Sequence, residues 1–309
     1  MTTLRPDSGR PDSGRSASQN VAVSRGGPTV VRVLLGARLR RLRESSGITR
    51  AEAGYQIRAS TAKISRLENG RVGLKERDIA DLLAFYGVDD EHRAAMMELA
   101  RRANAQGWWA EFGEVVPDWF EIYVGLEQAT SVIRTYEVQF VPGLLQTEDY
   151  ARCVALLGHL AGPAEQPAEQ IDRRVRLRLR RQGLLDGPDP PSLCAVVDEA
   201  ALRRPLGGSQ VMRAQLAHLI KISDRPNVVV QIMPFRRGGH AAAGGSFTIM
   251  RFAEPDLPDV VYLEQLTSAL YLEKRHDIEH YAQVMDRLSA QAEPPGNTAQ
   301  ILEKIIGAI

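Results

Sequence analysis

The sequence predicts an α+β fold, in which an all-α N-terminal domain of five helices is followed by a larger mixed α/β C-terminal domain. Two observations lead to this fold class. Residues 31–105 carry a succession of short amphipathic helix patterns, whereas strand-length apolar runs and longer helix patterns fill the rest. Helices and clustered strands without regular βαβ alternation are typical of α+β proteins. The chain has 309 residues, 44% hydrophobic and 25% charged, which is enough for about two globular domains.

The first two helices are marked by apolar spacing and by caps. Leu35, Leu39 and Leu42 form one apolar stripe, and Gly47 ends that helix. Residues 49–52 have the Thr-x-x-Glu spacing of a capping box, in which the threonine hydroxyl and the glutamate carboxylate each accept from a backbone amide. This spacing predicts that a second, short helix begins at residue 50.

Three further helices complete the N-terminal domain. Ser60 is an N-cap for a helix over residues 62–69, which Gly70 ends. A fourth helix has its apolar stripe within residues 79–86. Asp89 or Asp90 caps a fifth helix that continues to about residue 105.

In the C-terminal domain, helix and strand patterns follow one another less regularly. We expect helices that open at residues 147–149 and that cover residues 171–183, 212–222 and 275–292, and a last amphipathic helix after residue 296 with Ile301, Leu302, Ile305 and Ile306. We expect strands at residues 132–140, 193–197, 228–233, 246–252, 259–263 and 269–272. The chain therefore divides into a tail (1–30), the helical domain (31–105), the C-terminal domain (106–292) and a terminal amphipathic helix (293–309).

Charge is distributed unevenly between the two ends of the chain. Residues 1–77 hold 16 Lys/Arg against 6 Asp/Glu, whereas the remainder holds 23 against 32. Such asymmetry is typical of a nucleic-acid-binding end. Only five of the 39 basic residues are Lys, a bias that a GC-rich genome also produces, so Arg counts alone carry less weight. The tail repeats the pentapeptide of residues 5–9 at residues 10–14 and predicts disorder; the alternative is a basic arm that contacts DNA.

The segment from Gly47 to Arg71 has the parts of a helix-turn-helix. Two capped helices follow one another across a short turn. Ala53 and Gly54 provide the small residues needed where the two helices cross. Apolar anchors lie beneath both helices, at Ile48, Ile57, Ile64 and Leu67.

This segment resembles the lambda-repressor/Cro-like (XRE-type) helix-turn-helix proteins, through the Thr-x-x-Glu opening and the closing sequence ISRLENGR at residues 64–71. Arg50 replaces the usual Gln at the start of the bracing helix. Arg58 replaces the usual turn Gly, so we expect Arg58 to adopt a strained backbone conformation.

The resemblance implies a double-stranded DNA partner and a role for each matching residue. The side chains expected at base edges are Thr61, Ala62, Lys63 and Arg66. Those expected at backbone phosphates are Arg50, Ser60, Ser65, Asn69 and Arg71. Glu68 is expected to stabilise the domain. Proteins of this class commonly bind as homodimers; the last helix is a candidate interface, unless it packs on its own domain.

Several pieces of the C-terminal domain also resemble a known group. These are GWW at residues 107–109, YVGLE at 123–127, VPGLLQTEDYAR at 141–152, DEAALRRP at 198–205, VQIMPF at 230–235 and YLE at 262–264. They are similar to the actinobacterial WhiJ-like, antitoxin-like helix-turn-helix proteins. The resemblance implies a regulator that is often paired with a small partner protein encoded nearby.

Other candidate sites receive a plainer interpretation. His276 and His280 fit an H-x-x-E-H spacing, but they point away from the apolar face of their helix and lack a third ligand, so no metal is expected. The Arg-rich residues 173–181 are interpreted as a solvated helix face rather than a second DNA contact. Residues 238–245 are interpreted as a flexible hairpin loop; the alternative is a lid over a ligand with His240 as its polar contact. The three Trp are interpreted as core or domain-interface residues rather than a ligand cage.

The sequence therefore predicts a sequence-specific DNA-binding transcriptional regulator whose C-terminal domain binds an effector or a small partner protein. The alternative is an antitoxin-like interaction module that sequesters a small partner, with DNA binding for autoregulation. No catalytic residues, cofactor or metal are expected, and two cysteines cannot build a disulfide framework. No stretch approaches the about 18 apolar residues of a membrane span, and no signal sequence is evident, so we expect a cytoplasmic protein.

Overall fold

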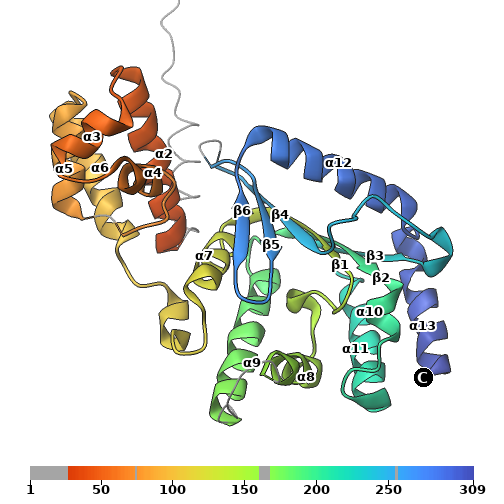
Figure 1. Cartoon of the computed structure of the whole chain (residues 1–309). Coiled ribbons are helices and arrows are strands. Elements are labelled where there is room, and N and C mark those ends of the chain that lie inside the picture. The colour runs from red at the N-terminus through yellow and green to blue at the C-terminus, as the bar shows by residue number, and fades with distance from the viewer. Residues whose placement is uncertain (1–26, 74, 160–167, 255–256) are drawn as a thin grey trace, which may run out of the picture.

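The computed structural model describes residues 27–73, 75–159, 168–254 and 257–309. The N-terminal domain has the five predicted helices, and the cap positions explain their bounds (Figure 1). They are α2 (Pro28–Ser45), α3 (Arg50–Gln56), α4 (Thr61–Glu68), α5 (Glu76–Phe85) and α6 (Asp90–Ala103). α2 begins at Pro28, a favourable first helical residue, so it starts three residues before the predicted domain boundary. The predicted disorder of the preceding tail lies outside the described residues.

The C-terminal domain is built on a six-stranded mixed sheet with the order β3-β2-β1-β4-β5-β6. β1, β2 and β3 are parallel, whereas β4, β5 and β6 continue the sheet in antiparallel pairs. The strands are β1 (Thr130–Glu137), β2 (Ser192–Asp198), β3 (Val228–Met233), β4 (Phe247–Phe252), β5 (Val260–Glu264) and β6 (Ala269–Leu272). The predicted α+β class is confirmed, and all six predicted strands are present.

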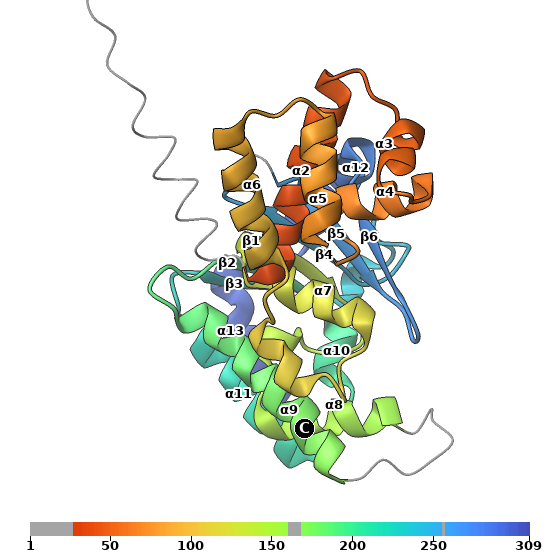
Figure 2. The same ribbon diagram turned by 90° about the vertical axis from the view of Figure 1, so that its left-hand side faces the viewer.

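Helices cover both faces of this sheet. On one face α12 (Arg275–Gln291) places Met285 and Leu288 against strand residues such as Val261. On the other face α11 (Gly208–Ile222) and α13 (Thr298–Ala308) pack on β2 and β3. The same side holds α7 (Asp118–Glu127), α8 (Glu148–His159), α9 (Ala168–Gln182) and the short α10 (Glu199–Arg203), as Figures 1 and 2 show. In the described part of the chain no helix is long and apolar enough to cross a membrane.

Three sequence interpretations of this domain were wrong or incomplete. Helix α7 was not predicted. The loop over residues 238–245 is not a hairpin, because β3 and β4 are separated by β2 and β1. It passes over the ends of these strands, where His240 Nε2 lies 2.9 Å from the Tyr136 hydroxyl. The last helix packs on its own domain, which was the alternative prediction, since Ile305 is only 1% exposed.

Part of the Arg-rich face of α9 is buried, whereas the sequence interpretation had it solvated. Arg181 is 8% exposed, and its Nε and Nη2 each donate a 2.7 Å hydrogen bond to Glu127 of α7. Burial lowers the pKa of Arg181, but the Glu127 carboxylate outweighs burial and raises it above its ordinary value. Arg178 is half-buried and donates to the Gln146 side chain; burial and the neighbouring Arg181 lower its pKa to about 10. These two side chains therefore bind α9 to its neighbours.

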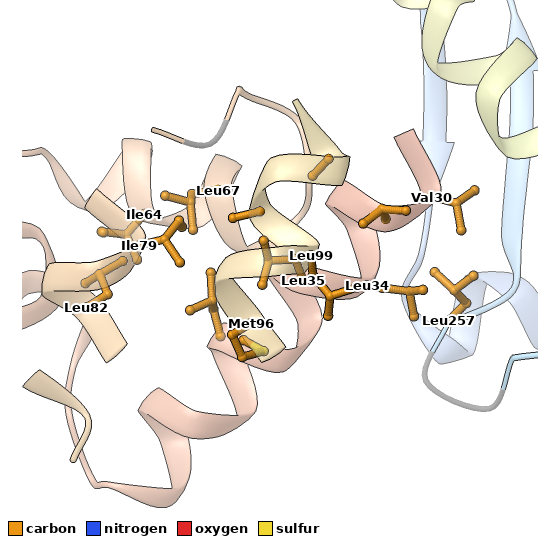
Figure 3. Packing of buried hydrophobic residues seen from close by; sticks show 14 of the residues in the cluster. Val30, Leu34, Leu35, Ile64, Leu67, Ile79, Leu82, Met96, Leu99 and Leu257 are labelled. Atoms are coloured by element: carbon orange, nitrogen blue, oxygen red, sulfur yellow. The ribbon is translucent and has the colours of Figure 1, made fainter. Parts of the chain in front are cut away.

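One apolar core continues from the N-terminal domain into the C-terminal domain. Figure 3 shows Val30 and Leu34 of α2 facing Leu257, which follows β4. Strand residues Phe252 and Val260 belong to the same cluster. Beside it, Thr29 is 2% exposed and lies against Gly125 of α7, where a Cβ would come within 2.4 Å of the Thr29 hydroxyl. The first helix of the N-terminal domain is thus seated directly on the C-terminal domain.

Glu137, the last residue of β1, makes the stability of the fold depend on pH. Burial raises the pKa of this carboxyl from 4.5 to about 7; a hydrogen bond from Ser246 lowers it, and the charge of Glu264 raises it. A carboxyl with a raised folded-state pKa stabilises the fold fully below its unfolded pKa and loses that contribution as pH rises through about 7. We expect Glu137→Gln to be more stable than wild type at about pH 8 and to lose this advantage at about pH 5.

Urea denaturation of both proteins at several pH values measures this difference. Glu303 is exposed on α13, so Glu303→Gln is the control and should follow wild type. An equal stability change for Glu137→Gln at all pH values would contradict the assignment.

Candidate nucleic-acid interface

The helix-turn-helix is held by the two caps that the sequence predicted. Thr49 Oγ1 accepts from the Glu52 amide at 3.2 Å, and the Glu52 carboxylate accepts from the Thr49 amide at 2.7 Å. Ser60 Oγ accepts from the Lys63 amide at 3.2 Å at the start of α4. Each cap satisfies backbone donors that the first helical turn leaves unpaired. The start and the direction of both helices are therefore defined by short-range hydrogen bonds.

The turn between α3 and α4 has the strained geometry expected from its sequence. Arg58 has a φ of 53°, and it is the one non-glycine residue with positive φ among the residues described. A side chain in this left-handed region is disfavoured by contact between Cβ and the backbone. Packing beneath the turn compensates for this backbone strain, since Ala53 is fully buried and Ile57 is 9% exposed.

The residues predicted to face bases divide into two groups. Thr61, Ala62 and Arg66 are exposed along α4. Lys63 is half-buried, and its ammonium forms a 2.7 Å ion pair with Asp78 of α5. Lys63 is thus engaged within the domain, whereas the other three side chains are accessible.

Glu68 is a buried carboxylate that pairs with two arginines of the N-terminal domain. It is 4% exposed and accepts from Arg43 Nε at 2.5 Å and from Arg50 Nε at 2.9 Å. Arg43 also donates to the Ile48 carbonyl at 2.8 Å. Glu68 is therefore engaged within the domain, and its stabilising role stays a prediction. Arg50, predicted at a phosphate, remains partly exposed, with its Nε on Glu68.

The end of α4 lies against the middle of α2. A Cβ on Gly36 would come within 2.6 Å of the backbone oxygens of both Leu67 and Glu68. Gly70, which follows the C-cap residue of α4, has a φ of 64° and packs against the Val33 backbone. Hence α2, the helix seated on the C-terminal domain, also positions the recognition helix.

Arg71 forms a direct link between the two domains. Its Nη2 lies 3.2 Å from Glu273 Oε1 and 3.3 Å from the Tyr271 carbonyl oxygen, at the end of β6. Sequence reasoning missed this contact, because the partners are about 200 residues apart. The predicted phosphate contact at Arg71 therefore competes with a carboxylate of the C-terminal domain. Of the other predicted phosphate contacts, Ser60 is exposed, and Ser65 and Asn69 are half-buried.

The remaining candidate sites stay apart from this interface. His276 and His280 are exposed on α12. No group of three or more His, Cys, Asp or Glu residues within the described ranges could hold a metal ion.

Comparison with known families agrees with this geometry. Residues 34–96 match a helix-turn-helix domain, which agrees with a DNA-binding N-terminal part. Residues 120–304 match a domain of unknown function, DUF5753. That match covers more than half of the chain, which therefore belongs to the DUF5753 family. The comparisons with curated proteins and with solved structures found no match.

The backbone contact at Gly36 makes a prediction about stability. Gly36→Ala places a methyl group against the backbone oxygens of Leu67 and Glu68, so α2 and α4 must separate. We expect a loss of about 1–3 kcal/mol in the free energy of unfolding, which overpacking typically produces. Gly307 is also helical but has open space around it, so Gly307→Ala is the matched control and should not destabilise. Chemical denaturation checks both variants; equal stability of the two would contradict the close approach.

The Arg71–Glu273 contact makes a prediction about DNA affinity. Glu273→Gln removes the carboxylate that holds Arg71, so the guanidinium is released for a phosphate. Because this ion pair is partly exposed, we expect DNA affinity to rise by about two- to fivefold at low salt. Glu303→Gln loses the same charge at the far end of the molecule and should leave affinity unchanged. Fluorescence anisotropy with a labelled duplex measures this; weaker binding by Glu273→Gln would contradict the competition.

Proposed function

We propose that this protein is a sequence-specific transcriptional regulator that reads DNA with α4. The observation that carries the proposal is the exposed face of this helix. Among the residues that the structure describes, the Arg66 guanidinium has neither a hydrogen bond nor an ion pair, and Thr61 and Ala62 lie exposed beside it. A free guanidinium on a helix of this class suits bidentate pairing with a guanine, and the Ala62 methyl suits a thymine methyl.

In this proposal the phosphates are contacted around the recognition helix. Arg50, Ser60, Ser65, Asn69 and Arg71 fix the register of the protein on the duplex. Lys63 reaches a base edge only after exchanging its Asp78 partner. Binding as a homodimer predicts a near-palindromic site, with half-sites spaced by about one helical turn or a multiple of it.

The C-terminal domain is proposed to regulate this binding through an effector or a small partner protein. The seating of α2 on this domain supports regulation, because the same helix positions α4. The resemblance to WhiJ-like, antitoxin-like regulators supports a small protein partner.

A second candidate function is an interaction module that sequesters a small partner. The observation that favours it is the apolar β5–β6 hairpin, where Leu266 is 98% and Leu270 55% exposed. β6 is also an edge strand, which can pair with another chain. A regulator enriches a specific DNA sequence by itself, whereas an interaction module needs its partner to do so.

The test is selection from a random duplex pool, followed by affinity measurement across a salt series. We expect wild type to enrich one sequence and to show a steep salt dependence. Arg66→Ala should lose about 1–3 kcal/mol for the selected site and relax specificity at one base position.

Arg213→Ala is the matched control, because Arg213 is exposed on α11 of the C-terminal domain. It should keep the wild-type preference. If wild type enriches no sequence, or if Arg66→Ala weakens selected and random DNA equally, the proposed readout is wrong.

A further inference from the structure

Arg58, in the turn between α3 and α4, combines an unfavourable backbone conformation with an exposed side chain. Its φ of 53° lies in the left-handed region, where glycine is favoured because it has no Cβ. The side chain is exposed, and in the described part of the chain its guanidinium has no hydrogen bond, ion pair or aromatic contact. The arginine therefore introduces strain without a contact inside the protein that offsets it.

The backbone of this turn is held without the Arg58 side chain. The Arg58 amide donates to the Tyr55 carbonyl at 3.1 Å, and the Ala59 amide donates to the Gly54 carbonyl at 2.7 Å. The two helices also approach closely here, since a Cβ on Gly54 would come within 2.6 Å of the Ala59 carbonyl oxygen. A glycine at position 58 would adopt the same turn with less strain. Folding therefore does not account for the arginine, and strained residues of this kind gather at functional sites.

The turn places Arg58 next to the recognition helix. Figure 2 shows α3 and α4 side by side. Ser60, the exposed N-cap of α4, follows two residues later, so the two Cα atoms are at most about 8 Å apart. In helix-turn-helix complexes the first of the two helices crosses the phosphate backbone, and Arg58 directly follows Ile57, the C-cap of α3. An arginine at this place suits a phosphate, because a guanidinium binds phosphate oxygens through paired hydrogen bonds.

We propose that Arg58 is an additional contact with the DNA backbone, and that the strained turn presents its guanidinium to a phosphate near Ser60. The contact carries no sequence information, because every phosphate offers the same oxygens. It strengthens binding to all duplex DNA by releasing condensed counterions. This inference rests on the proposed DNA binding but not on base readout by Arg66.

The experiment compares full-length variants that separate the charge from the backbone strain. Arg58→Gly and Arg58→Asn remove the charge, and both new residues tolerate the left-handed conformation. Arg58→Lys keeps the charge and the strain. Arg213→Gln removes a charge from the exposed surface of α11 in the C-terminal domain and is the matched control. Fluorescence anisotropy measures the affinity of each protein for the selected duplex and for a random duplex of equal length, between about 50 and 200 mM salt.

We expect Arg58→Gly and Arg58→Asn to reduce the slope of log affinity against log salt concentration by about 0.9, the value for one phosphate contact on duplex DNA. Affinity for both duplexes should fall by the same factor, about five- to tenfold at about 0.1 M salt. Arg58→Lys and Arg213→Gln should keep the wild-type slope. An unchanged slope in Arg58→Gly overturns the contact, and a loss confined to the selected duplex overturns its assignment to a phosphate.

Urea denaturation measures whether the Arg58 side chain contributes to folding. We expect the midpoints of Arg58→Gly and Arg58→Asn to be at least as high as that of wild type, because the strain is relieved and no contact is lost. Lower midpoints for both variants overturn the inference, since the side chain would then have a role within the fold.

The salt series also distinguishes this inference from the proposed function on which it rests. If wild type binds neither duplex in a salt-dependent manner, the proposed DNA-binding function is wrong, and the Arg58 contact with it. If wild type binds and the variants keep its slope, the contact alone is wrong. Because the random duplex is measured as well, failure of the Arg66 readout leaves the test of Arg58 intact.

Discussion

The structure depends on two contacts of helix α2, one with the C-terminal domain and one with the recognition helix α4. Its first turn packs on the C-terminal domain, where Thr29 meets Gly125 and where Val30 and Leu34 join the cluster of Leu257. Two turns later, Gly36 lies against the backbone of the last turn of α4. Since a helix transmits position along its length with little deformation, the orientation of the recognition helix follows from how α2 sits on the larger domain. The Arg71–Glu273 contact adds a second, weaker link between the same two parts, because both side chains are partly exposed.

Two buried carboxylates fix the elements on either side of this helix. Glu68 binds Arg43 of α2 and Arg50 of α3, and so ties three helices of the N-terminal domain at one point. Glu127 binds Arg181 and ties α7 to α9. Desolvation offsets much of the attraction in such pairs, whereas loss of one partner leaves an uncompensated buried charge. Their main effect is therefore to make alternative arrangements of these helices unfavourable.

The sequence predicted the elements whose signals are local. Caps, apolar spacing and breakers placed the five N-terminal helices and all six strands, and the resemblance to helix-turn-helix proteins indicated the strain at Arg58. Helix α7 was missed because its sequence, DWFEIYVGLE, is apolar on several sides and contains a glycine. Tertiary contact explains both features: Tyr123 packs on Tyr262, and Gly125 admits Thr29. The parallel pairing of β1–β3, the burial of Arg181 by Glu127 and the Arg71–Glu273 contact were also missed. Each of them joins residues far apart in the chain, which no local pattern records. The base-facing and phosphate-facing residues of the site remain predictions.

The junction between the domains combines favourable apolar packing with unfavourable polar burial. Three of the buried side-chain atoms without a partner in the described residues lie around it, namely Arg32 Nε, Gln128 Oε1 and Glu254 Oε1. Burial also lowers the pKa of Arg32, an effect that the charge of Glu121 opposes. Apolar contact thus holds the two domains together, while the unpaired polar atoms make the same contact less favourable. A phosphate at Arg71 would replace its contact with Glu273. In the proposed DNA complex this contact between the domains and the phosphate contact therefore exclude one another, so each weakens the other by the same coupling free energy.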